Sequence, residues 1–194
     1  MQVLKGSLTS EEMNDRTMSN LGFRVIALTF RVRDFLRPRK EILKEVGIEE
    51  GFRVLDFGCG PGSYVRVVAE LVGKSGKVYA LDINPLAIQM VKEIAKKNQL
   101  ANVETILSDC KTGLPRGSVD VVLLYDIFHD LTNAEIVLEE LRRVLKRDGI
   151  LSFSDHHMKE DEIISKVTIH GLFRLQRKGT KTYSSVKAQA KSEA

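Results

Sequence analysis

Short apolar runs alternate with amphipathic stretches along most of this sequence. The apolar runs cover residues 53–57, 77–82, 103–107, 119–126 and 149–155. Each has the length of a single strand, and the run at 119–126 is apolar at nearly every position, as in a strand buried on both faces. Because helical patterns separate the runs, we predict a parallel sheet with helices on both faces.

The segments between the strands carry start signals for helices. We predict helices at 62–73 and 159–168, and a further helix for which Asn84 is the N-cap. Thr132 and Glu135 have the spacing of a capping box, which predicts another helix start.

The two ends of the chain differ from this alternating middle. Apolar residues at helical spacing predict an amphipathic helix over 20–36, and Pro38 is placed to open a second helix that runs to Val46. Near the other end, "LFRLQR" and "TKTYSSV" flank Lys178-Gly179 and predict a hairpin. We therefore divide the chain into a flexible segment (1–18), a helical cover (19–46), a sheet domain (47–186) and a disordered tail (187–194).

Composition adds three expectations. The 194 residues are 43% hydrophobic and 29% charged, which is ordinary for one soluble globular domain. No apolar run is long enough to span a membrane and the start shows no signal peptide, so we expect a cytoplasmic protein. Cys59 and Cys110 do not suggest a disulfide framework, and we expect both to be reduced.

The net charge of +4 is unevenly distributed, with basic residues gathered towards both ends of the chain. Such ends could attract an anionic substrate, a nucleic acid or a membrane surface. They could equally be solvated faces with no partner.

The stretch "VLDFGCGPGSY" at 54–64 is the most informative in the sequence. Glycines at 58, 60 and 62 follow the first strand and precede a helix. Glycine permits a tight turn and close approach of the backbone, and a helix N-terminus adds bare amides. The spacing is G-x-G-x-G, because Ser63 stands where a dinucleotide pattern has its third glycine.

Acidic residues narrow the class of ligand. Asp56 lies inside the glycine motif, where a carboxylate would repel a pyrophosphate but suits an ammonium group. Asp82 ends the second strand, where an acid can accept both hydroxyls of a ribose. Asp109 closes the third strand, where an acid can receive an adenine amino hydrogen. S-adenosylmethionine (SAM) combines an ammonium, a ribose and an adenine without phosphate.

The segments "VLDFGCGPG", "ALDINP", "SDC" and "VDVVLLYDIFHDL" resemble, in order and spacing, the motifs of class I SAM-dependent methyltransferases. They are most similar to the small-molecule branch with the ubiquinone/menaquinone C-methyltransferases (methyltransferase type 11). The resemblance covers about residues 40–186 and implies a doubly wound, seven-stranded Rossmann-like α/β sheet with an antiparallel C-terminal hairpin. It also implies that these residues bind the cofactor: Asp56, Gly58, Cys59, Gly60, Asp82, Ile83, Asp109, Cys110 and Tyr125.

Candidate catalytic residues follow the fourth and fifth strands. His129, His156 and His157 come after predicted strand ends, and Asp126 lies beside them. A histidine there could take a proton from an acceptor, although each could also be a capping or solvent-facing residue. A metal site formed by His129, His156 and Asp126 has no supporting spacing signature, so we predict none.

We therefore expect a methyltransferase that uses SAM, releases S-adenosylhomocysteine and methylates a small acceptor, an apolar one being among the options. The alternatives are an RNA methyltransferase, which the basic ends motivate, and a non-catalytic SAM-binding regulator or partner subunit. Peripheral membrane contact through residues 20–36 is a further alternative.

Overall fold

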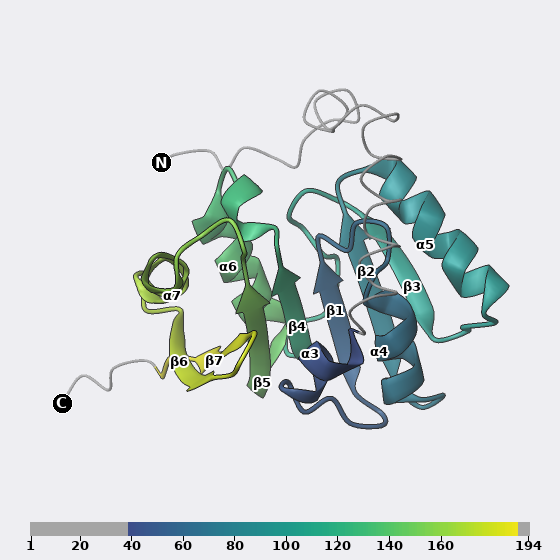
Figure 1. Ribbon diagram of the computed structural model, residues 1–194, viewed down its shortest axis with the longest axis horizontal. Coiled ribbons are helices and arrows are strands. Elements are labelled where there is room, and N and C mark those ends of the chain that lie inside the picture. The colour runs from purple at the N-terminus through teal and green to yellow at the C-terminus, as the bar shows by residue number, and fades with distance from the viewer. Residues whose placement is uncertain (1–38, 190–194) are drawn as a thin grey trace.

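The computed structural model describes residues 39–189, and these form a twisted sheet between two layers of helices (Figure 1). The strand order in this part of the chain is β3-β2-β1-β4-β5-β7-β6. All pairings are parallel except those of β7, which runs antiparallel to both β5 and β6. The predicted mostly parallel α/β sheet with a terminal antiparallel hairpin is confirmed.

The strands closely follow the apolar runs of the sequence. Their bounds are Arg53–Phe57 for β1, Lys77–Asp82 for β2, Val103–Leu107 for β3, Val119–Tyr125 for β4, Leu145–Ser154 for β5, Phe173–Lys178 for β6 and Tyr183–Lys187 for β7. The β5 strand starts earlier than predicted because residues 145–148 continue directly from a helix into the sheet.

Helices cover the two faces of the sheet in two groups. They are α3 (Lys40–Lys44), α4 (Val65–Val72), α5 (Pro85–Lys97), α6 (Ala134–Val144) and α7 (Glu160–Thr168), with a 3-10 turn, η1, at Phe128–Asp130. Inward residues of α3 and α4 pack with Val54, Val78 and Val121 of the central strands. Residues of α6 and α7 pack on the other face, against Leu55, Val122 and Phe153. Successive strand residues thus point to opposite layers, as the period of a strand requires.

Two predicted helix starts differ from the structure. The capping box was wrong: Asn133 is the N-cap of α6, its side chain makes no capping hydrogen bond, and Thr132 is exposed one position too early. Glu135 then lies at the second helical position, one short of the position that a capping box requires. The helix predicted at 62–73 begins only at Val65, because the positive φ of Gly62 keeps the chain in the turn. Asn84 does cap α5, accepting a hydrogen bond of 2.9 Å from the Leu86 amide.

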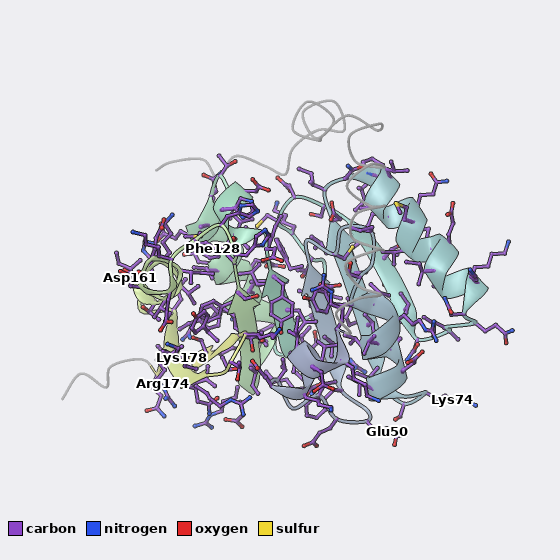
Figure 2. All side chains as sticks on the ribbon, in the orientation of Figure 1. Glu50, Lys74, Phe128, Asp161, Arg174 and Lys178 are labelled. Carbon is purple, nitrogen blue, oxygen red and sulfur yellow. The ribbon has the colours of Figure 1, made fainter. Side chains whose placement is uncertain are left out.

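The C-terminal hairpin ends later than expected. Lys187 is the last residue of β7 rather than the start of a loose tail, and the Ala188 amide donates to the Leu172 carbonyl at 3.0 Å. Figure 2 shows Arg174 and Lys178 of β6 at the edge of the molecule opposite α5. The predictions for 1–18 and 20–36 lie outside the described residues. Within 39–189, no helix has the length and apolar character needed to cross a membrane.

Candidate active site

The three glycines of the loop between β1 and α4 have three different surroundings. All have a positive φ, at 75° for Gly58, 51° for Gly60 and 84° for Gly62. A Cβ on Gly58 would lie 2.8 Å from Cγ1 of Ile127, and one on Gly62 would lie 2.9 Å from Cδ1 of Ile94. A Cβ on Gly60 would meet no described atom within 4 Å. Only Gly60 therefore leaves open space for a ligand, while the other two glycines make room for the protein's own side chains.

Asp56 is a buried acid near the end of β1. Only 3% of the residue is exposed, and no group among residues 39–189 hydrogen-bonds to its buried Oδ2. Burial, reinforced by the Asp82 carboxylate, raises the pKa of Asp56 from 3.8 to about 7. A buried carboxylate oxygen without a hydrogen-bond partner destabilises the fold, so we expect Oδ2 to bind a cationic or hydrogen-bond-donating group of a ligand.

The carboxylate of Asp82, the last residue of β2, holds the glycine loop in place through a hydrogen bond. Its Oδ2 accepts a hydrogen bond from the Gly60 amide and its Oδ1 accepts one from the Asn84 amide, both at 2.8 Å. Burial raises the pKa of Asp82, although these amide hydrogen bonds oppose the rise. Each oxygen still has a second lone pair, so the carboxylate can hold the loop and accept from a ligand as well.

Cys59, Tyr125 and Ile83, which are also predicted to bind the cofactor, differ in their burial and in their contacts. Cys59 is buried, and burial together with Asp82 and Asp56 raises the pKa of its thiol. Tyr125 ends β4 and shares a 2.7 Å hydrogen bond between its hydroxyl and Oγ of Ser152. Ile83 is half-buried directly after β2.

Asp109 does not close the third strand as predicted. The β3 strand ends at Leu107, so Asp109 and Cys110 both lie in the loop beyond it, and both are half-buried. The two cysteines of the chain are free thiols, as expected.

Two aspartate–histidine pairs form where β4 and β5 end, and each joins one strand end to the other. Nδ1 of His129 lies 2.8 Å from Oδ2 of Asp155. Nδ1 of His156 lies 2.7 Å from Oδ1 of Asp126. The ring of His157 stacks between the other two, with ring centroids 4.3 Å from His129 and 3.9 Å from His156. The structure therefore brings together the four residues predicted to be catalytic.

Sequence reasoning missed Asp155 as a central residue of this group. Its side chain is fully buried, and it accepts hydrogen bonds from the His129 ring and from the amides of His129 and His157. Burial alone would raise the pKa of Asp155, but these hydrogen bonds lower it, so the carboxylate stays charged. The available signal was its place directly after β5 and directly before two histidines.

Asp126 holds an unusual backbone conformation. Its φ of 53° is one of only two positive values among the non-glycine residues described. Such strain costs of order 1–3 kcal/mol and is common at functional sites. It directs the carboxylate towards the amide and ring of His156.

Comparison with known proteins places this architecture in a family. The profile of the family described as "Methyltransferase domain" matches residues 48–189. The chain belongs to this methyltransferase domain family. A solved SAM-dependent methyltransferase from Aquifex aeolicus superposes with a TM-score of 0.71 at 25% identity, covering 94% of this chain and all of that one. The family and the fold imply SAM as the cofactor of this methyltransferase domain.

Curated relatives of the domain act on small molecules according to their names. The demethylmenaquinone methyltransferase of Geobacillus sp. (strain WCH70) is 31% identical over 118 residues, covering 60% of this chain and 50% of that protein. The (S)-coclaurine N-methyltransferase of Thalictrum flavum subsp. glaucum is 31% identical over 109 residues, covering 56% and 30%. This chain thus spans half or less of the length of these two relatives. They do not favour the alternative of an RNA methyltransferase.

Proposed function

We propose that this protein transfers a methyl group from SAM to a small acceptor. The observation that carries the proposal is the buried Oδ2 of Asp56, which no described group satisfies, in a loop opened at Gly60. An ammonium group would satisfy this carboxylate and keep it charged. A pyrophosphate in its place would add negative charge beside two buried acids.

The residues present fit SAM in three respects. Asp56 would hold the ammonium of its methionine part, and the bare backbone at Gly60 would allow close approach. Asp82 would accept from the ribose hydroxyls while it keeps the Gly60 amide in place. We assign Ile83, Asp109, Cys110 and the Tyr125 carbonyl to cofactor contacts because they lie at or just after the ends of strands.

SAM supplies an electrophilic methyl group on its sulfonium and leaves as S-adenosylhomocysteine. The acceptor atom forms the new bond to that carbon, and a proton on it must pass to a base. We assign this role to His129, because Asp155 fixes its ring through Nδ1. When Nδ1 donates to the carboxylate, Nε2 of the neutral ring carries the lone pair that can take the proton. Oδ2 of Asp130 lies 3.4 Å from Nε2 and would stabilise the ring once it is protonated.

The acceptors in the relatives' names are the first to test, namely demethylmenaquinone and (S)-coclaurine. Turnover is measured as S-adenosylhomocysteine release from the full chain. A non-catalytic regulator would bind SAM but release no product with any acceptor tried. A cytoplasmic location, membrane contact and nucleic-acid contact stay predictions of the sequence.

Calorimetry with SAM and with NAD tests the cofactor assignment. We expect SAM to bind and to raise the melting temperature, and NAD to do neither. Asp82→Ala should weaken SAM binding at least ~10-fold, because the ribose loses its acceptor and the Gly60 amide loses its anchor. Asp148→Asn, at an exposed site in β5, is the matched control and should bind SAM normally. NAD binding in place of SAM, or full SAM affinity in Asp82→Ala, would contradict the assignment.

A further inference from the structure

The ends of β4 and β5 bring together a set of side chains that can chelate a metal. Asp126, Asp155 and His156 each offer one ligand atom, and these atoms all lie within 4.8 Å of one another. The sequence predicted no metal site, and the set considered and set aside there had His129 in place of Asp155.

We propose that Asp126, Asp155 and His156 form a binding site for a divalent first-row transition metal ion such as Mn²⁺ or Zn²⁺. Two carboxylates and one imidazole form a mixed oxygen and nitrogen set, which suits such ions better than Ca²⁺ or Mg²⁺. Ligand bonds of about 2.0–2.2 Å place the ligand atoms about 3–4 Å apart, so the group needs little movement to close around an ion.

The charges of the group favour a cation. Two carboxylates that follow different strands converge, and Asp155 accepts hydrogen bonds from the His129 ring and from the amides of His129 and His157, which fix its position. Nδ1 of His156 lies 2.7 Å from Oδ1 of Asp126, so these two ligand atoms already face each other across the ends of the two strands.

Two neighbouring histidines contact the proposed metal ligands and hold them in position. The His129 ring donates to Asp155 at 2.8 Å when it carries its proton on Nδ1, which orients the carboxylate. The ring of His157 packs 3.9 Å from that of His156, centroid to centroid, and limits its rotation. Ligands held in this way lose less freedom when an ion binds.

The site is open on one side. The side chains of His156 and Asp126 are 60% and 28% exposed, whereas that of Asp155 is fully buried. Three protein ligands with an open side are typical of metal sites that also bind a substrate. The ion would lie at the strand edge that carries Asp56 and Asp82, where it could bind an acceptor oxygen or nitrogen and ease its deprotonation. That role rests on the proposed function, but binding of the ion does not.

The test is Mn²⁺ binding to the untagged full chain, without SAM or acceptor. After treatment with a chelator, the protein is titrated with Mn²⁺ and free ion is measured by electron paramagnetic resonance. We expect one equivalent to bind, and Asp126→Asn and His156→Gln each to weaken binding at least ~10-fold. His170→Gln is the control, because it removes a similar exposed pair, with Nδ1 of His170 3.3 Å from Oε1 of Glu135, outside this group.

The outcomes separate this site from the proposed function. Thermal melting shows whether each variant is folded, and a SAM titration shows whether the cofactor site is intact. Loss of Mn²⁺ binding with normal SAM binding supports the site. Absence of Mn²⁺ binding to the wild type at millimolar concentration, or equal binding in Asp126→Asn and His156→Gln, would overturn it. A protein that binds Mn²⁺ but not SAM would retain the metal site and lose the methyl-transfer proposal.

Discussion

Replacement of Asp56 by asparagine should make the ligand-free protein more stable and weaken its binding of SAM. The carboxyl group is buried and no described group hydrogen-bonds to its Oδ2, so its ionised form destabilises the ligand-free fold and a cationic ligand would offset that cost. Asparagine has nearly the same shape without the charge. A residue selected for stability alone would not destabilise the ligand-free fold while it strengthens ligand binding.

The cost can be worked out from the pKa of Asp56. It rises from 3.8 to about 7, mainly because of burial and further because of Asp82. At about 1.4 kcal/mol for each pKa unit, ionisation of the carboxylate destabilises the ligand-free fold by at most about 4 kcal/mol. Loss of a charge-assisted hydrogen bond to SAM, at about 1.5–3 kcal/mol, predicts roughly 10- to 100-fold weaker binding.

The contribution of Asp56 to the free energy of unfolding changes with pH in one direction. Between about pH 4 and pH 7 the folded state keeps the Asp56 proton while the unfolded state has lost it, so this group's contribution to stability falls as pH rises. The advantage of Asp56→Asn should therefore be small near pH 4 and largest above about pH 7. SAM affinity of the wild type should rise over the same range, because the charged carboxylate is the form that binds an ammonium.

Urea unfolding at a series of pH values measures the first effect, and calorimetry with SAM measures the second. Asp148→Asn removes an exposed acid and should show neither. The reasoning fails if Asp56→Asn is less stable than the wild type above about pH 7, or if it binds SAM as tightly.

Four further substitutions test other parts of the molecule. Gly60→Ala and Gly62→Ala should both lose stability, because each glycine has a positive φ that strains an alanine. Gly62→Ala should lose more, because its Cβ would also lie 2.9 Å from Cδ1 of Ile94, whereas the Cβ at Gly60 meets no described atom within 4 Å and should mainly weaken SAM binding. Melting and SAM titration of both variants would show the contrast, and equal effects would contradict it. Glu45→Gln should cost about 1–3 kcal/mol near pH 7 in urea unfolding. Burial alone would raise the pKa of Glu45, but hydrogen bonds from residues 180–182 stabilise its charge and lower the pKa. The loss of stability in Glu45→Gln should therefore fade as the pH falls below 4.5, the ordinary pKa of the group. A loss of stability that persists at low pH would contradict the prediction. His129→Gln should lower turnover and leave SAM affinity unchanged, and undiminished S-adenosylhomocysteine release would remove this residue from the mechanism.

Local sequence determined most of the sheet. The first three strands have the predicted bounds because their apolar residues gather in short segments that are followed by turn residues. Asn84 caps its helix as expected, since an N-cap acts through an amide only two residues away. The capping box at Thr132 and Glu135 was wrong because the turn after η1 delays the helix by one residue, which the motif alone does not show.

The sequence also predicted the cofactor motif, but it did not show that the three glycines of this motif have different roles. Gly58 and Gly62 are needed because Ile127, Val91 and Ile94 approach them from other elements, and only the packed structure brings these side chains there. The spacing of the three glycines is the same whether each one faces a ligand or a neighbouring side chain.

Tertiary structure alone decided the pairing at the catalytic end. The sequence sets Asp126 near His129 and Asp155 beside His156, yet the hydrogen bonds join Asp126 to His156 and His129 to Asp155. Parallel pairing brings Tyr125 opposite Ser154, so the residues that follow meet across the strands rather than along them. Contacts between residues about 26–30 positions apart depend on strand register, which no local pattern encodes.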